Sequence, residues 1–340
     1  AILVELAGVT SRLFCWLLGL TLAALPAFTT TLMFGYAADA YMLALILSGA
    51  AALLVCRMKG WKGVALGALC LMLSMAIYQC YLDVTVFLCL LVILLGGLFE
   101  KRPWREQLAQ AGRMLLMGVL GVVAYMLSAK AALAVMDLAA SDYGGFDTMG
   151  QLDLAASLDA LYQLYLAPRH IFMDKFCYAT NLGWQLAGWA ALGLMGLMTL
   201  WVIWRRKLWQ NKLPLALALL SLAAMPAGCS ALAVLQPQNF PYNSLNGFAN
   251  GLFLVVLPIL AARLAQVEGS QELVGKALRW LSLAVCCLLC WHFILLANQA
   301  YRVSRVITER DHANANRVLA RMEITEGYDL DGPVYFGGVW

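Results

Sequence analysis

Apolar residues follow one another along this chain in runs of about twenty, separated by short polar and charged stretches. A run of this length crosses the hydrocarbon core of a bilayer as one α-helix. Complete spans are therefore predicted at 13–33, 38–57, 63–80, 82–99, 112–135, 183–204, 213–235, 247–267 and 278–299. The polar cluster at 78–83 divides the apolar stretch 63–99 into two of these helices. The first nine residues, which include no initiator Met, have the pattern of the end of one further helix, so an earlier span is expected.

The composition leads to the same class of protein. Of the 340 residues, 63% are hydrophobic and 12% are charged, and the mean hydropathy is +0.78. An ordinary soluble domain has about 25% charged residues, so a soluble enzyme, a disordered protein and a nucleic-acid binder are excluded. The predicted fold class is an all-α polytopic membrane protein, with about nine complete transmembrane helices and a partial one.

Basic residues collect on alternate connections between the predicted spans. Of the 23 Lys and Arg residues, fifteen fall on one set of connections, three on the opposite set and five in the C-terminal tail. The positive-inside rule places the basic set in the cytoplasm. The opposite set, which contains Lys130, Arg169 and Lys175, and the tail are then expected outside.

Two regions follow from this map. Residues 1–299 form a multi-span transmembrane domain with a long outer loop at 136–182. Residues 300–340 form an outer tail, in which a charged helix at 301–322 precedes a turn and a short apolar strand. We expect this tail to be the beginning of a small αβ element that the chain truncates.

Carboxylates near the outer membrane boundary are the first candidates for chemistry. Asp39 and Asp83 are pinned there by short turns, and Asp83 follows Tyr78, Gln79 and Tyr81 closely. Phenol, amide and carboxylate groups together are suited to holding a sugar, and an ionisable group at this depth is costly unless it faces a cavity or a partner. The alternatives are a helix N-cap at Asp39 and an aromatic belt with a capped turn at 78–83.

Cations on the same side are candidates for binding phosphate. Lys130 lies just inside the outer end of its helix, where it either holds a phosphate or extends its ammonium group to the interface. Arg169 and His170 follow Pro168 in the long outer loop. Arg169 is a candidate fork for phosphate and His170 a candidate proton shuttle, although a lone loop His is more often simply solvent-exposed.

Two strings and the tail carry a family resemblance. FGYAADAYMLALILS at 34–48, KGVALGALCLMLSMAIYQCYLDVTV at 62–86 and DHANANRVLARMEI at 311–324 resemble the bacterial type II Gtr-like glucosyltransferase family. The resemblance extends from about residue 1 to 340. It implies a GT-C-type membrane enzyme that moves glucose from a polyprenyl-phosphate carrier to a cell-surface polymer. Enzymes of this type place an essential carboxylate in the first outer loop, which is expected to precede residue 1.

The resemblance also implies partners and a location. The partners are a polyprenyl-phosphate-linked sugar, a cell-surface polysaccharide such as O-antigen or teichoic acid, and the lipid bilayer, with no nucleic acid. The location is the bacterial plasma (inner) membrane. The reaction needs a carboxylate, Asp39 or Asp83, to accept a proton and a cation, Lys130 or Arg169, to hold the leaving phosphate. The residues do not decide whether the reaction uses a divalent cation. Two alternative functions also stay open: a surface-polysaccharide polymerase and a flippase for polysaccharides or lipid-linked sugars.

Overall fold

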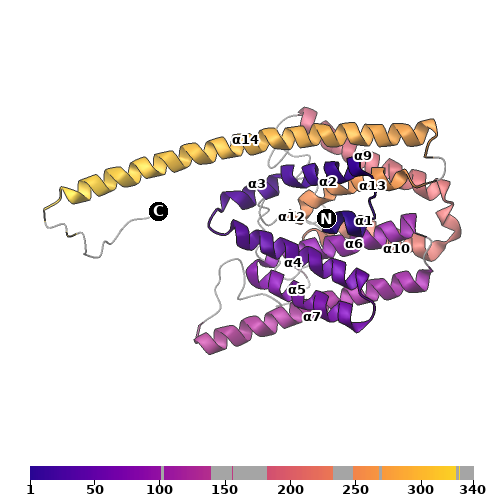
Figure 1. Cartoon of the computed structure of the whole chain (residues 1–340), viewed down its shortest axis with the longest axis horizontal. Coiled ribbons are helices and arrows are strands. Elements are labelled where there is room, and N and C mark those ends of the chain that lie inside the picture. Colours follow the sequence, from indigo (N-terminus) through magenta and orange to yellow (C-terminus); the bar gives the residue numbers. More distant parts are fainter. Residues whose placement is uncertain are drawn as a thin grey trace. The chain divides into compact units, whose positions relative to one another are not determined.

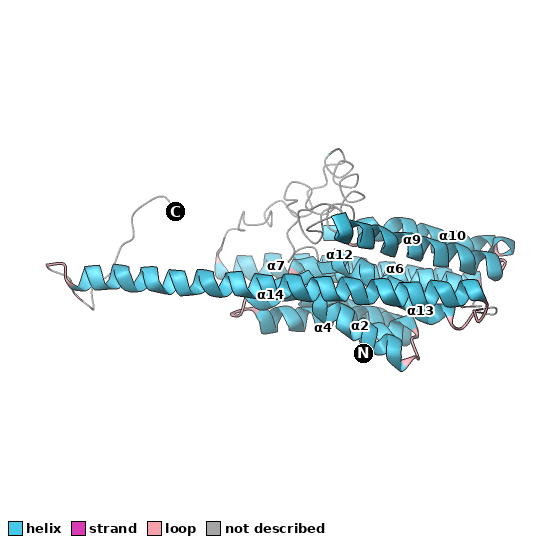
Figure 2. Ribbon diagram, turned by 90° about the horizontal axis from the view of Figure 1, so that it is seen from above, coloured by secondary structure: helices cyan, strands magenta, loops and turns pink. Residues whose placement is uncertain are grey.

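Every regular element in the described part of the chain is a helix (Figure 2). The computed structural model describes residues 1–100, 103–138, 155, 182–232, 248–267, 270–326 and 329. The elements in Figure 1 are α1 (Ile2–Ala7), α2 (Arg12–Ala24), α3 (Pro26–Met33), α4 (Ala38–Arg57), α5 (Trp61–Ile77), η1 (Gln79–Tyr81), α6 (Leu82–Phe99), α7 (Trp104–Met136), α9 (Leu182–Arg205), η3 (Leu208–Gln210), α10 (Lys212–Gly228), α12 (Phe248–Leu252), η4 (Phe253–Val255), α13 (Val256–Leu264) and α14 (Leu273–Glu323).

Helix length and hydropathy support a membrane protein with several spans. Among the described residues, five helices are long and apolar enough to cross a bilayer: α4, η1 with α6, α7, α9 and α14. The bent pair of α2 and α3 makes a sixth if it counts as one span. Three apolar helical segments are shorter: Trp61–Ile77, Lys212–Gly228 and Phe248–Leu264. The helical multi-span class therefore agrees with the structure, whereas the number of nine spans stays a prediction.

The span predicted at 13–33 is broken in the middle. α2 ends at Ala24, α3 begins at Pro26, and the two are bent by 49°. Proline has no N–H to donate and disfavours helical geometry in the residue before it, so Leu25 is extended, with ψ 131°. The hydroxyls of Thr30 and Thr31 donate back to the carbonyls of Pro26 and Ala27. The predicted span at 13–33 thus corresponds to a bent helix pair that passes as one candidate span only when its two parts are taken together.

α6 is the most buried of the candidate spans. It contacts α4 and α10, while α5 lies between α4 and α7 (Figure 1). Small residues allow these helices to approach closely, as is usual in membranes. A Cβ at Gly97 would lie 2.7 Å from the Pro214 carbonyl oxygen of α10, and a Cβ at Gly121 of α7 would lie 2.8 Å from Leu71 of α5.

The C-terminal part differs from the expected tail. α14 is one unbroken helix over Leu273–Glu323, where the sequence predicted a span at 278–299 and a separate charged helix at 301–322. The contacts divide the chain into the units Ala1–Leu296 and Ala297–Trp340, and the described part of the second unit contains no strand. The strand of the predicted αβ element falls at 330–340, outside the described residues, so that element stays a prediction.

Two neighbouring glycines of α6 provide a matched test of the packing. Gly97→Ala should lower the free energy of unfolding by about 1–3 kcal/mol, because its Cβ meets the Pro214 carbonyl and Ala218. Gly96 has nothing within 4 Å of the same position, so Gly96→Ala should be neutral or slightly stabilising. Thermal unfolding of the purified protein in detergent checks both. Equal melting temperatures for the two variants would contradict the α6–α10 contact.

Candidate functional site

One end of the first unit gathers the basic connections. Arg57 at the end of α4 pairs with Glu5 of α1. Arg206 Nη1 donates to the Leu98 carbonyl at 2.6 Å, and Arg263 Nη1 donates to the Gly8 carbonyl at 3.3 Å. Arg113 Nη1 likewise donates to the carbonyl of Met58 at 3.5 Å. The connections that the charge pattern assigned to one side therefore meet at one end, which we term the basic end.

Burial at the basic end affects the guanidinium group of Arg206. Arg206 is half-buried against α6, and desolvation lowers its pKa from the ordinary value. A guanidinium group nevertheless stays protonated at neutral pH. Its charge is therefore available to the carbonyl at the C-terminal end of α6, where the helix dipole is negative.

The other end carries a row of aromatic rings. Ring centroids lie 4.7 Å apart for Tyr41 and Tyr78, and 5.5 Å apart for Tyr78 and Tyr81. The remaining neighbouring pairs are 5.7–6.4 Å apart. In order of contact, the aromatic row consists of Tyr36, Phe34, Tyr41, Tyr78, Tyr81 and Phe248. Since Tyr41 and Arg57 lie at opposite ends of α4, the row is about 24 Å from the basic end.

Exposure falls along this row. Tyr36 is 85% exposed, Tyr41 and Tyr78 are partly buried, and Tyr81 and Phe248 are fully buried. The row therefore runs from the surface at the α3–α4 connection to the core at α12. Such edge-to-face and tilted pairs stabilise beyond the area that they bury. The row thus has an exposed ring at Tyr36 and phenol groups at several depths.

Hydrogen bonds fix the turn from which the middle of the row projects. Ser48 Oγ of α4 donates to the Tyr81 carbonyl at 2.8 Å and lies 2.9 Å from Thr85 Oγ1 of α6. Thr85 Oγ1 in turn donates to the Ser48 carbonyl at 3.0 Å. Hydroxyls that bond between helices stabilise membrane bundles modestly. These bonds hold the start of α6 against α4 and fix the position of Tyr81.

The four side chains predicted to form one cluster at 78–83 point to different partners. Tyr78 lies between Tyr41 and Tyr81 in the aromatic row. Gln79 Nε2 donates to Tyr125 Oη of α7 at 2.6 Å. Asp83 instead accepts a hydrogen bond from the backbone beyond α10. The structure thus brings the two tyrosines together in the row and directs the amide and the carboxylate elsewhere.

Asp83 is buried and bonded to the backbone. Its Oδ1 accepts the N–H of Leu232 at 2.8 Å, and the Ala231 N–H is a second donor. Only 3% of the residue is exposed. The two amides begin a helical turn after the break at Cys229 and Ser230, so the carboxylate serves them as a cap from another helix. Its assignment as a catalytic carboxylate stays a prediction.

Asn250 is a polar residue of this region that the sequence analysis missed. Its Nδ2 donates to Ser230 Oγ at 3.0 Å and to the Cys229 carbonyl at 3.4 Å. Within the described chain, the buried Asn250 Oδ1 and Tyr81 Oη have no hydrogen-bond partner of normal geometry, although the Thr31 hydroxyl is close to the phenol. The sequence signal that could have identified Asn250 is the single amide inside the apolar run at 248–257.

The other predicted site residues have simpler surroundings. Asp39 is exposed, lies second in α4 after the N-cap Ala37, and its Oδ1 accepts the Ala40 N–H at 2.9 Å. It is therefore a first-turn carboxylate, and the N-cap that was the alternative for this residue is Ala37 instead. Lys130 is exposed on α7. Arg169 and His170 lie outside the described residues, and no metal-binding group of three His, Cys, Asp or Glu side chains occurs in the part that the structure describes.

Together these features define a helical membrane protein with one cationic end and one aromatic end. Comparison with known families then gives the class of enzyme: the family described as Glucosyl transferase GtrII matches residues 1–261. The chain belongs to this family, and it is a membrane glucosyltransferase with a sugar donor and an acceptor. No curated protein and no solved structure gives a significant match to the chain.

The bond between Asp83 and Leu232 generates a prediction. Asp83→Ala should lower the free energy of unfolding by about 1–3 kcal/mol, since it leaves two partly buried N–H groups without their acceptor. Asp83→Asn should cost less, because an amide oxygen still accepts a bond at a helix start. The measurement is thermal unfolding in detergent, with the exposed Asp39→Asn as the control. A normal melting temperature for Asp83→Asn combined with lost glucose transfer would instead identify Asp83 as the catalytic carboxylate.

Proposed function

We propose that this glucosyltransferase is of the GT-C type and transfers glucose from a polyprenyl-phosphate donor to a cell-surface polysaccharide, such as O-antigen or teichoic acid, at the outer face of the bacterial inner membrane. The observation that carries the proposal is the aromatic row at the end opposite the basic connections. The membership of the chain in the glucosyltransferase family supports the sugar and the reaction type.

Charge gives the proposed side of the membrane. The basic end carries Arg57, Arg113, Arg206 and Arg263, whose positive charges favour the cytoplasm. The aromatic row then faces outward, together with Asp39 at the start of α4. A lipid-linked sugar in the outer leaflet can reach this end without crossing the hydrocarbon core.

The aromatic row suits a sugar that is desolvated gradually as it binds. The C–H faces of a glucose ring pack on aromatic rings, and its hydroxyls need polar partners once water is removed. Tyr36 offers an exposed ring, whereas Tyr78 lies half-buried next to Tyr41. We place the sugar and the acceptor chain along the rings from the exposed Tyr36 to the half-buried Tyr78, and the lipid tail in the surrounding bilayer.

The proposed chemistry is a single displacement at the sugar. An acceptor hydroxyl oxygen forms a bond to C1 of glucose, the bond from C1 to the phosphate oxygen breaks, and polyprenyl phosphate leaves. A carboxylate accepts the hydroxyl proton. Asp39 is the described candidate for this base, because it is exposed and Asp83 is engaged by backbone N–H groups. Lys130, Arg169 and His170 are the proposed partners of the leaving phosphate and its proton.

The donor can be tested directly. Purified protein in proteoliposomes should transfer labelled glucose from polyprenyl-phosphate-glucose to an acceptor polysaccharide. It should not transfer glucose from a nucleotide sugar when no lipid carrier is present. Scintillation counting of the isolated polymer measures both reactions. Direct use of the nucleotide sugar would overturn the proposed donor, and movement of the lipid-linked sugar across the bilayer without transfer would favour a flippase.

The proposed orientation has its own test in a version without the ten native cysteines. Tyr36→Cys, at an 85% exposed position of the aromatic row, should react with an impermeant maleimide in intact cells. Lys212→Cys, exposed near the basic end, should react only after the cells are opened. The reverse labelling pattern would invert the orientation. It would also place the proposed sugar site in the cytoplasm.

A further inference from the structure

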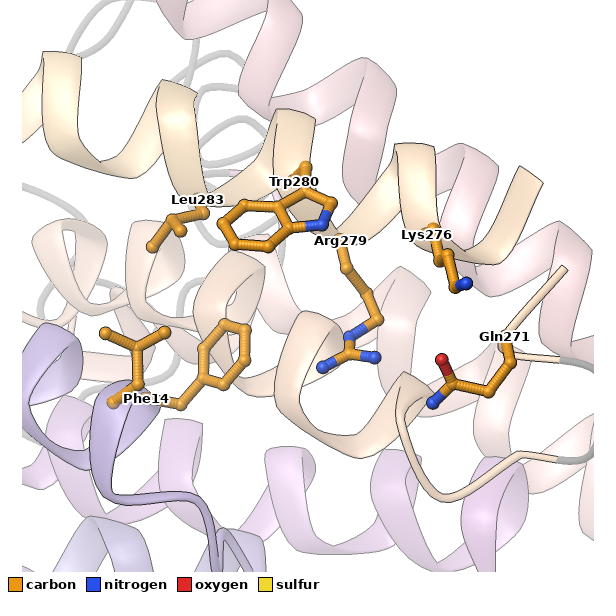
Figure 3. A pocket seen from close by; sticks show the side chains of 7 residues that line it. Phe14, Gln271, Lys276, Arg279, Trp280 and Leu283 are labelled. Atoms are coloured by element: carbon orange, nitrogen blue, oxygen red, sulfur yellow. The ribbon is translucent and has the colours of Figure 1, made fainter. Parts of the chain in front are cut away.

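A pocket lies at the basic end between α2 and the first turns of α14, far from the aromatic row. Its volume is about 330 Å³, and its polar lining comes from Gln271, Lys276 and Arg279. Figure 3 shows Arg279 extending from α14 into the space between the ring of Phe14 and the amide of Gln271. A tetrahedral anion fits easily within this volume.

The charges around the pocket favour an anion. Two of its lining residues are cations, and no carboxylate lines it among the residues that the structure describes. Glu272, the acidic neighbour of Gln271 in the sequence, pairs with Arg205 of α9 instead. The buried Nε of Arg279 has no hydrogen-bond partner within the described chain. An Arg with an uncompensated buried donor fits a phosphate or carboxylate ligand that accepts from its fork.

The remaining lining is apolar and lies at the membrane boundary. Trp280 is 67% exposed and Leu13 is 55% exposed, and both line the pocket beside Leu283. Residues 280–299 of α14 include no Lys, Arg, Asp or Glu, and this stretch begins directly after Arg279. Exposed Trp residues of this kind belong to the interface, where headgroups meet hydrocarbon. A ligand here has its charge among Lys276, Arg279 and Gln271 and its apolar part against Trp280 and Leu283.

We propose that this pocket binds the phosphodiester headgroup of an anionic membrane phospholipid. Arg279 grips two phosphate oxygens in parallel, Lys276 adds a point charge, and the Gln271 amide donates to the remaining oxygen. The acyl chains lie along Trp280 and Leu283 in the adjoining leaflet. Bound there, the lipid links the start of α14 to α2, whose buried Phe14 also lines the pocket.

The experiment is lipid retention by the purified full chain, measured by native mass spectrometry from nanodiscs that contain equal amounts of phosphatidylglycerol and phosphatidylcholine. The wild type should retain phosphatidylglycerol selectively. Arg279→Gln should lower this retention about tenfold, because it removes a charge-assisted pair of hydrogen bonds. Lys276→Gln should lower it less, and Arg279→Lys should restore only part of it.

The control is Lys212→Gln, which removes an exposed charge near the same end but outside the pocket. It should leave retention unchanged, and an equal loss there would reduce the effect to general surface attraction. Each variant is also checked by thermal unfolding without added phosphatidylglycerol, and Arg279→Lys preserves the fold if Arg279→Gln does not. Unchanged retention by folded Arg279 variants, or displacement of the lipid by millimolar inorganic phosphate, would overturn the proposal.

Discussion

Inside a bilayer, every backbone N–H and C=O needs a partner within the protein, because the hydrocarbon offers none. The breaks in this bundle obey that constraint. Where the helix stops at Cys229 and Ser230, the N–H groups of Ala231 and Leu232 find the carboxylate of Asp83 on α6. The side chain of Asn250 reaches the same break from α12. A charged residue at this depth is costly, and here it satisfies two donors at once.

Several features gather around that break. Tyr81 lies two residues before Asp83, its carbonyl is held by Ser48, and its ring meets Phe248 of α12. The buried end of the aromatic row is thus fixed by the bonds of Ser48 and lies next to the residues that satisfy the break, Asp83 on α6 and Asn250 on α12. Its outer end at Tyr36 lies on the short connection between α3 and α4. The row thus has a buried inner end and an exposed outer end, which suits the partly hydrated substrate of the proposed sugar site.

The helical architecture was predicted well from the sequence, because it follows from the distribution of apolar and charged residues. Hydropathy indicated the helices, and the sorting of Lys and Arg indicated which connections share an end. The residues at 78–83 also mark the division between two helices, as predicted. Their partners were not predictable, since Gln79 bonds to Tyr125 from 46 positions away and Asp83 to Leu232 from 149 positions away. A local cluster in the sequence says nothing about which helices surround it.

The helix boundaries that were predicted wrongly, in the first long apolar run and in α14, have local causes in the sequence. Pro26 divides the first long apolar run, but a hydropathy window passes over one proline. α14 continues through residues 299–301 because the sequence there holds no Gly or Pro, so the change from apolar to charged residues alters the surroundings of the helix and not its geometry. Asn250 escaped notice because a single amide in an apolar run is usually a minor packing feature. Its partners emerge only when α10 and α12 are brought together.

The arginines of the basic end act at two stages, during membrane insertion and in the folded bundle. During synthesis, each positive charge opposes passage through the membrane and so helps to decide which way the growing chain is threaded. In the finished bundle, three of them close the open carbonyls of Gly8, Met58 and Leu98. Under the proposed orientation, a substitution at Arg206 therefore removes both a charge that directs insertion and the hydrogen bond to the Leu98 carbonyl. Which substitutions these positions accept is then set by the stricter of two requirements, a positive charge during insertion and a hydrogen-bond donor in the folded bundle.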